Sequence, residues 1–388
     1  MKNIFSISGA FLFLFLSCQS RSVPSFQTDV DSIVRRVVPD RRIGICDLNL
    51  IERGGAKLVL RGESMFPAAN TEVLKFFTKR GIDIIDSTVL IPDTVHLEKW
   101  WGLISLSVAN MRSKPGHASE MVSQAIMGTP VRILKDGDGW FLIQTPDRYI
   151  GWTNKSAVQP MSYLEILNWR KANRLICRLS EGKIYADPQK KGVISDLVAG
   201  AIVIRNSENH GMTQVILPDG RVGYVPGLNW LNFNQWKDSV SLRSERMIVD
   251  GKQFLGFPYL WGGTSSKGMD CSGFVKTVCF LNGIILERDA SQQIRHGVEV
   301  DLSRGFDNLK QGDLLFFGSK QPFRVNHVGI YIGNSELIHE SGSVHINSLN
   351  KNRANFNSDL CSNIVGARRI IGALPEPGYW TIKMHQWY

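Results

Sequence analysis

Three residues in the C-terminal part of the chain have the types and spacing needed for nucleophilic catalysis. Cys271 follows the glycine-rich stretch WGGTSSKGMD, His327 comes 56 residues later, and His339 follows after a further 12. A cysteine thiolate is a strong nucleophile, an imidazole can take its proton, and a third polar residue can orient that imidazole. The set predicts thiol-dependent acyl transfer, with Cys271 as the nucleophile.

The residues around Cys271 predict the start of a helix. Asp270 is a natural N-cap, and apolar residues recur after it with helical spacing at Phe274, Val275, Val278 and Leu281. Cys271 would then lie in the first turn, where the peptide dipoles favour an anion, so we expect a lowered thiol pKa and a populated thiolate. The N–H groups of that turn could also donate to an oxyanion. Cys279 falls inside the helix and is predicted to be core packing.

The two histidines lie in segments with strand character. His327 begins the alternating stretch HVGIYIG, and His339 lies in LIHESG after a turn at Gly333–Asn334. Two adjacent antiparallel strands would bring the imidazoles together. A single histidine is more often a structural residue than a catalyst, so the prediction depends on the pair. The remaining histidines are expected to be structural: His96, His117, His210, His296, His345 and His385.

The first residues indicate export. Residues 1–18 combine Lys2, a short apolar core and Ser17–Cys18, and that core is too short for a permanent membrane span. FLSC resembles a bacterial lipobox, which implies lipid attachment at Cys18, a membrane anchor and a periplasmic location. Ordinary cleaved secretion and a retained anchor are the alternatives. Export also removes nucleic acid as the partner for the net charge of +10.

Cysteine usage argues against a disulfide scaffold or a metal site. Five cysteines follow Cys18, an odd number, widely spaced and without zinc-ligand spacing: Cys46, Cys177, Cys271, Cys279 and Cys361. We therefore expect no metal and no cofactor, and at least one unpaired thiol.

The 388 residues divide into several predicted regions. Residues 19–100 read as a small α/β region, with helices at 30–38 and 70–81 (the second capped by Asn70) and strands at 57–62 and 82–93. Residues 139–153 and 211–225 repeat one hairpin pattern around a Pro-Asp turn, which predicts two small β-barrel domains at 101–165 and 166–238. Residues 239–388 form the predicted catalytic domain.

The motifs YLWGG…DCSGF, HVGIYIG and the second histidine strand resemble the NlpC-type family of bacterial cell-wall cysteine peptidases. The two barrels resemble bacterial Src-homology-like domains. The resemblance implies an α+β class with a papain-like catalytic fold. It also implies that Cys271 is the nucleophile, His327 the general base and His339 the residue that orients the base.

The whole layout resembles γ-D-glutamyl-L-diamino acid endopeptidases of peptidoglycan recycling. That resemblance implies release of L-Ala-γ-D-Glu from stem peptides with a free L-Ala amine, by a protein expected to be a monomer. Glu120 and Tyr149 would accept the ammonium, since a buried unpaired charge is costly. Tyr149 is replaced by Arg221 in the second repeat. The alternative for Glu120 is an ordinary carboxylate at a helix start.

Further residues follow from the same resemblance. Tyr259 and Trp261 would line the cleft, although Trp261 could equally be an aromatic core residue. Ser272 and Asp289 would contact the γ-D-Glu segment. Ser291 is the weakest assignment, because Ala290 stands where the family often has serine.

Two other functions stay open from the sequence. One is a hydrolase of intact peptidoglycan that uses both barrels for wall binding. The other is a non-catalytic wall-binding lipoprotein, whose Cys271 would not react with iodoacetamide near neutral pH. The sequence does not decide between L-Lys and meso-diaminopimelate as the diamino acid.

Overall fold

The computed structural model describes residues 23–53, 57–94, 97–209, 211–228 and 230–388. The chain forms two compact units: one runs to Pro39 and resumes at Ile45–Leu90, and the other combines Asp40–Gly44 with Ile91–Tyr388. The leader and Cys18 lie outside the described residues. Within these ranges, no helix is long and apolar enough to cross a membrane.

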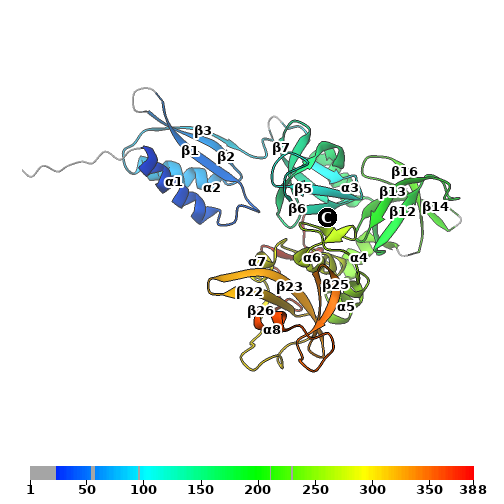
Figure 1. Ribbon diagram of the computed structural model, residues 1–388. Coiled ribbons are helices and arrows are strands. Elements are labelled where there is room, and N and C mark those ends of the chain that lie inside the picture. The colour runs from blue at the N-terminus through cyan, green and yellow to red at the C-terminus, as the bar shows by residue number, and fades with distance from the viewer. Residues whose placement is uncertain (1–22, 54–56, 95–96, 210, 229) are drawn as a thin grey trace, which may run out of the picture. The chain divides into compact units, whose positions relative to one another are not determined.

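The first unit packs two helices on one face of a three-stranded sheet (Figure 1). Strands β1 and β2 are antiparallel, whereas β2 and β3 are parallel and are connected through helix α2. The apolar faces of the helices and the sheet form a separate core that includes Val30, Leu60 and Phe77. The elements are α1 (Val23–Val37), β1 (Cys46–Arg53), β2 (Lys57–Ser64), α2 (Pro67–Thr78) and β3 (Ile84–Leu90).

Several predicted boundaries in this region are wrong. Helix α2 begins at Pro67, because a proline with its fixed φ suits the first helical position, and Phe66 is the N-cap. Asn70 is therefore inside the helix, where its buried amide donates to Thr88 Oγ1 at 2.6 Å. Helix α1 also begins well before the predicted residue 30.

Two seven-stranded sheets follow, and we call them the first and second β domains. The order in the first is β10-β4-β7-β8-β9-β5-β6, and in the second β13-β12-β16-β15-β14-β11-β17. The first domain contains β4 (Trp101–Ile104), β5 (Val108–Arg112), β6 (Met121–Ile126), β7 (Pro130–Asp136), β8 (Trp140–Gln144), β9 (Ile150–Asn154) and β10 (Val158–Met161). The second contains β11 (Arg174–Cys177), β12 (Glu181–Tyr185), β13 (Val193–Val198), β14 (Ile202–Asn209), β15 (Met212–Ile216), β16 (Val222–Pro226) and β17 (Trp230–Asn232).

The internal repeat corresponds to equivalent hairpins. β8 pairs with β9, and β15 pairs with β16, each pair being antiparallel around its Pro-Asp turn. Between the domains lies α3 (Tyr163–Lys171), which begins with a capping box formed by Ser162 and Glu165. The predicted hairpins are therefore confirmed.

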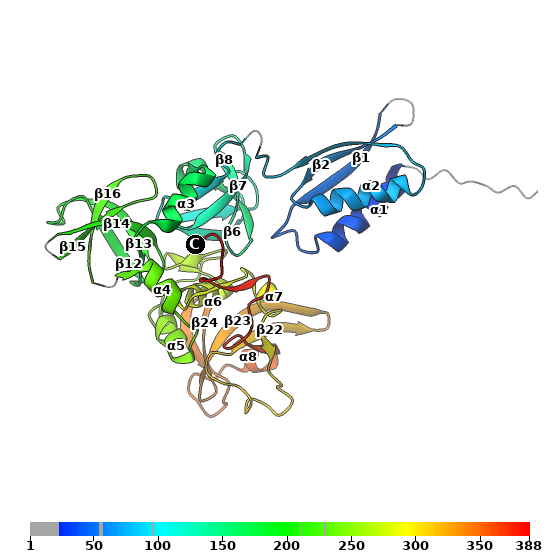
Figure 2. The ribbon, with the colours of Figure 1, turned by 180° about the vertical axis from the view of Figure 1, so that it is seen from behind.

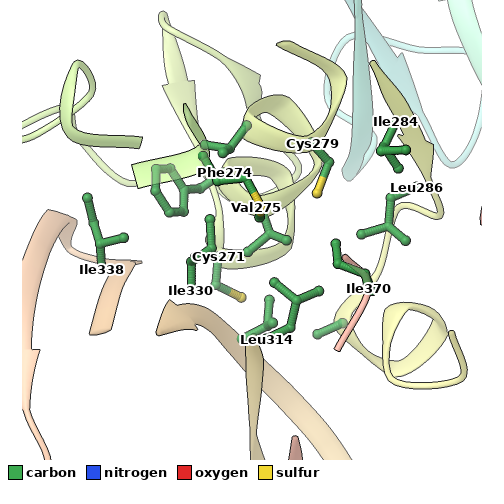
Figure 3. Packing of buried hydrophobic residues seen from close by; sticks show 14 of the residues in the cluster. Cys271, Phe274, Val275, Cys279, Ile284, Leu286, Leu314, Ile330, Ile338 and Ile370 are labelled. Atoms are coloured by element: carbon green, nitrogen blue, oxygen red, sulfur yellow. The ribbon is translucent and has the colours of Figure 1, made fainter. Parts of the chain in front are cut away.

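The C-terminal domain is built on a six-stranded antiparallel sheet in the order β21-β26-β22-β23-β24-β25. Helix α6 packs its apolar side on this sheet, where Phe274 and Val275 share one buried cluster with Ile330 (Figure 3). The sheet strands are β21 (Val298–Glu299), β22 (Leu314–Lys320), β23 (Phe323–Gly333), β24 (Glu336–Ser341), β25 (Ser343–Ser348) and β26 (Ile364–Arg369). The helices are α4 (Phe233–Ser239), α5 (Ser244–Lys252), α6 (Cys271–Leu281), α7 (Ala290–Gln293) and α8 (Ser358–Ser362).

Short strand pairs and the C-terminal segment complete this domain. The pairs are β18 (Thr264–Ser265) with β19 (Gly268–Met269), and β20 (Ile284–Leu286) with β27 (Tyr379–Thr381). After β27 the chain runs to the first β domain (Figure 2), where the Trp387 ring meets Trp101 at 5.1 Å between centroids. The last residues thus tie the catalytic domain to the first β domain.

Candidate active site

Cys271 is the first residue of α6, as the sequence predicts. The Asp270 carboxylate caps the helix by accepting from the Gly273 N–H at 2.8 Å, and its other oxygen accepts from the Gly262 N–H at 2.9 Å. One carboxylate therefore fixes both the helix start and the glycine pair before it. Figure 3 shows Cys271 at this end of the helix, beside Ile330 of the sheet, with Cys279 further along in the core.

The thiol is not activated in the way that the helix start suggests. Burial, and after it the neighbouring Asp270 carboxylate, raise the pKa of Cys271 to about 12, because the side chain is only 7% exposed. The dipoles of a helix terminus favour an anion by at most about 2 kcal/mol. Desolvation of a buried ion costs several kcal/mol and therefore outweighs them. The predicted populated thiolate is wrong, and the resting group is the neutral thiol.

The two histidines meet across neighbouring strands, which confirms the predicted geometry. His327 on β23 and His339 on β24 approach with 2.9 Å between Nε2 and Nδ1. Burial, followed by the charges of His339 and His345, lowers the pKa of His327 to about 3. Burial also lowers the pKa of His339 to about 4. Both imidazoles are therefore neutral around pH 7.

Asn347 sets the protonation pattern of this pair, and the sequence analysis missed it. Its Nδ2 donates to the Asn355 carbonyl at 3.3 Å, which orients Oδ1 toward His339 Nε2 at 2.9 Å. His339 must then carry its proton on Nε2 and accept at Nδ1 from His327 Nε2–H. This leaves the lone pair of His327 on Nδ1.

The thiol lies against the strand that carries this lone pair. Cys271 Sγ is 3.9 Å from the Asn326 carbonyl oxygen and receives a backbone hydrogen bond from Val328, so it contacts the backbone on both sides of His327. The thiol thus lies next to the strand segment that carries His327, and a neutral thiol whose proton reaches a neutral imidazole with a free acceptor can lose that proton as the sulfur attacks. The arrangement suits proton transfer during attack rather than a preformed ion pair.

Arg288 is a second residue that the sequence analysis missed. It is 1% exposed, and its guanidinium grips both oxygens of Asp270, with 3.0 Å from Nη1 to Oδ1. Nη1 also donates to Ser272 Oγ at 2.8 Å. Arg288 therefore holds the N-cap that positions Cys271, and it engages the hydroxyl that the resemblance assigns to substrate. Only the fold brings residues 270 and 288 together.

The first β domain reaches the glycine-rich loop through β6. Glu120 directly precedes β6, so the alternative of a helix-start carboxylate is wrong. Its exposed carboxylate accepts from Trp261 Nε1 at 2.9 Å, and Trp261 is itself exposed rather than part of the core. Gln124 Oε1 accepts from the Thr264 N–H at 2.9 Å. Glu120 and Trp261 thus form one polar pair at the junction of the two domains.

Tyr149 does not contact the Glu120–Trp261 pair and lies instead beside Asp289. Its hydroxyl donates to Asp289 Oδ2 at 3.1 Å, and burial, followed by the Asp289 charge, raises the pKa of the phenol. Ser291 and Asp289 both bind Arg42. The structure thus brings Tyr149, Asp289 and Ser291 together, whereas Glu120 contacts Trp261.

Tyr259 is exposed and lies close to the nucleophile. Burial, and then the nearby Cys271 and Asp270 groups, raise the pKa of Tyr259 to about 12, so its hydroxyl stays a hydrogen-bond donor. Its backbone N–H donates to the Gly342 carbonyl at 3.0 Å, which joins the loop before Trp261 to the β24–β25 turn. The role of Tyr259 in lining a cleft stays a prediction.

Two polar residues close to the His327–His339–Asn347 chain were not predicted from the sequence as parts of the site. His345 shares the Asn347 oxygen at 3.1 Å, although we expected it to be only structural. Glu340 is fully buried, and neither of its oxygens meets a partner among the described residues. Burial, followed by the Asp270 charge, raises the pKa of Glu340 to about 7. Across the described ranges, no cluster of three or more His, Cys, Asp or Glu side chains could hold a metal ion.

The fold and the Cys–His–His site agree with two known domain families. Residues 256–362 match the NlpC/P60 family, and residues 111–158 match the bacterial dipeptidyl-peptidase SH3 domain. The C-terminal domain is an NlpC/P60 domain preceded by an SH3 domain, and the protein is a cysteine peptidase.

Several known proteins are similar to about two thirds of this chain. A γ-D-glutamyl-L-lysine dipeptidyl-peptidase of Bacillus cereus is 28% identical over 267 residues, which cover 67% of this chain and 77% of the relative. Dipeptidyl-peptidase 6 of Lysinibacillus sphaericus is 27% identical, with 68% and 96% covered. The crystal structure of an NlpC/P60 family protein from Bacillus cereus superposes with a TM-score of 0.61 at 24% identity, over 70% of this chain and 99% of that one.

Proposed function

We propose that the protein hydrolyses the γ-D-glutamyl-L-diamino acid bond of peptidoglycan stem peptides and releases L-Ala-γ-D-Glu. The single observation that carries the chemistry is the chain Asn347–His339–His327, which leaves Nδ1 of His327 unprotonated on the strand beside the Cys271 thiol. The name of the Bacillus cereus relative supports the choice of bond.

The reaction follows from the resting protonation state. Cys271 Sγ attacks the γ-carbonyl of the D-Glu residue while its proton moves to His327 Nδ1, and N–H groups at the start of α6 donate to the oxyanion. His327 then gives that proton to the leaving amine, and a thioester remains. Water attacks the thioester with His327 again taking the proton, and the thiol and the free dipeptide are restored.

Recognition of a free L-Ala amine is the second part of the proposal. The support is a set of acceptors where β6 and β9 of the first β domain meet the catalytic domain: the exposed Glu120 beside Trp261, and Asp289 beside Tyr149. An ammonium taken out of water needs such partners. An acylated amine carries no positive charge and could not pair with these carboxylates.

The test compares L-Ala-γ-D-Glu-L-Lys, the corresponding diaminopimelate peptide and their N-muramoyl forms, with product identification by mass spectrometry. We expect the dipeptide from the free peptides only, and no product with Cys271→Ala. Glu120→Gln should raise KM for free peptides, whereas Asp138→Asn, an exposed acid of the same domain, should not. Equal rates on free and muramoyl peptides would reject the amine requirement. Activity confined to intact sacculi would favour a wall hydrolase.

We further propose that the protein is exported, attached to lipid at Cys18 and exposed to the periplasm. The leader sequence is the support. Labelling with a fatty acid should mark the wild type and not Cys18→Ala. Labelling of both proteins would contradict lipid attachment at this residue.

A further inference from the structure

A short stretch of the chain from outside both family-matched segments enters the site. Residues 40–44 lie between α1 and β1 in sequence, yet they belong to the same compact unit as the catalytic domain. The Arg42 carbonyl accepts from the Ile150 N–H at 2.9 Å, and the Ile43 carbonyl accepts from the Gln144 amide at 3.2 Å. The segment is therefore fixed to β8 and β9 of the first β domain.

Arg42 points from this segment to residues assigned to substrate. Its Nη1 donates to Asp289 Oδ2 and to Ser291 Oγ, both at 2.9 Å. Asp40 holds the other side of the guanidinium, with 2.8 Å from Nε to Oδ1 and 2.7 Å from Nη2 to Oδ2. Gln292 donates to the same Asp40 carboxylate at 3.0 Å. The guanidinium is thus oriented from two sides.

Arg42 still has capacity for a ligand. Four of its five N–H bonds are used by these contacts, and the second N–H of Nη2 meets no acceptor in the part of the chain that the structure describes. The side chain is 38% exposed. Arg288, in contrast, is buried and committed to Asp270. Arg42 can therefore bind a substrate group with its remaining N–H, whereas Arg288 would first have to give up its buried partner Asp270.

The chemistry of the proposed substrate matches this pair of charges. The segment L-Ala-γ-D-Glu has an ammonium at its N-terminus and, because the peptide bond uses the γ-carboxyl group, a free α-carboxylate a few bonds away. Asp289 and Arg42 present the opposite charges side by side. Guanidinium groups bind carboxylates through directed, charge-assisted hydrogen bonds.

We propose that Arg42 binds the α-carboxylate of the γ-D-Glu residue and makes the enzyme select D-Glu over its α-amide, D-isoglutamine. This inference rests on the proposed function. Arg42 is a specificity-determining residue supplied by the N-terminal part of the chain, outside the segments 111–158 and 256–362 that match known families.

The test uses two peptides that differ in one group: L-Ala-γ-D-Glu-L-Lys and L-Ala-γ-D-isoglutaminyl-L-Lys. For the wild type we expect kcat/KM to favour the carboxylate peptide by about tenfold to a hundredfold, the range for a hydrogen bond to a charged group. Arg42→Ala should lose this preference through KM for the carboxylate peptide, and Arg42→Lys should keep part of it. Arg41→Ala removes an exposed charge one residue away and should leave the ratio unchanged.

The ratio within each variant separates recognition from folding, because a folding defect lowers both rates equally. An unchanged ratio in Arg42→Ala would overturn the proposal. Faster turnover of both peptides would also overturn it, since residues 40–44 would then block the site. Calorimetric binding of both peptides to Cys271→Ala tests Arg42 without turnover. A preference that depends on Arg42 there, with no hydrolysis by the wild type, would retain Arg42 as a carboxylate ligand and reject the proposed function.

Discussion

The protonation state of Cys271 at rest can be tested by measuring how fast the thiol is alkylated at different pH values. A buried neutral thiol beside a neutral His327 should be alkylated slowly at neutral pH, and the rate should rise with pH up to the thiol pKa of about 12. A preformed thiolate–imidazolium pair would instead react fast from mildly acidic pH upward. The two states of the dyad therefore differ in the shape of one pH profile.

The magnitude follows from the thiolate population. A pKa of about 12 instead of the ordinary 9.0 lowers the thiolate fraction at pH 7.5 from about 3% to about 0.003%, roughly a thousandfold. A more basic thiolate is intrinsically more nucleophilic, and a Brønsted coefficient near 0.45 raises the rate constant of the thiolate by about 20-fold, which offsets part of the thousandfold loss. Cys271 should therefore react about 50-fold more slowly than a free thiol, before any effect of its burial.

The assay is iodoacetamide labelling between pH 6 and 10, with the peptide that contains Cys271 quantified by mass spectrometry. N-acetylcysteine in the same tube is the reference, and His327→Ala is the matched variant, which should leave the profile unchanged. A plateau below pH 7 that His327→Ala abolishes would refute the reasoning, because it would reveal the ion pair. Slow labelling at neutral pH consequently does not identify a non-catalytic protein, so turnover must decide that alternative.

Three further predictions concern polar groups of the C-terminal domain. Asn347→Leu should lower kcat by about tenfold to a hundredfold with little change in KM, because His339 loses the acceptor that sets its tautomer, whereas Asn347→Asp should retain activity. Arg288→Met should lower the free energy of unfolding by about 3–5 kcal/mol in urea titrations, because it leaves Asp270 buried and unpaired, and adding Asp270→Asn should restore part of it. Burial raises the pKa of Glu340 from its ordinary 4.5 to about 7, so the protonated carboxyl gives its full contribution to stability below pH 4.5, and that contribution is lost as the pH rises through about 7. Glu340→Gln should therefore stabilise the protein by about 3 kcal/mol at pH 8 and little at pH 4.5.

Each of these predictions has a contradicting result. Equal losses of kcat in both Asn347 variants would mean that the side chain only packs. An unchanged unfolding midpoint in Arg288→Met would mean that Asp270 is solvated. A stability gain in Glu340→Gln that does not depend on pH would exclude ionisation as its origin.

Local patterns predicted the catalytic elements because the information lies within a few residues. The helix that begins at Cys271 follows from Asp270 and from the apolar spacing after it, and both are visible in the sequence. The strands that carry His327 and His339 likewise follow from their own alternation. The Asn70 cap failed for a local reason also, since Pro67 is a stronger start signal than an asparagine further along.

The rest depends on contacts between distant residues. Asp270 pairs with Arg288, and Arg42 reaches Asp289 across 247 positions of sequence, so no local pattern announces either contact. The prediction of a lowered thiol pKa was wrong because it used only the helix dipole, which can be inferred from the sequence. The degree of burial, which raises the pKa, depends on how the whole domain packs.

The position of residues 40–44 has a consequence for the modularity of this protein. The chain passes between its two compact units three times, after Pro39, after Gly44 and after Leu90. A chain shortened to begin at residue 91 would keep both family-matched segments and lose Arg42. Residues 45–90 share one hydrophobic core with helix α1, so they could not be exchanged without it, and exchange of the whole N-terminal region would remove Arg42. Gain or loss of that region during evolution would therefore add or remove Arg42 beside Asp289 and Ser291, the proposed carboxylate site.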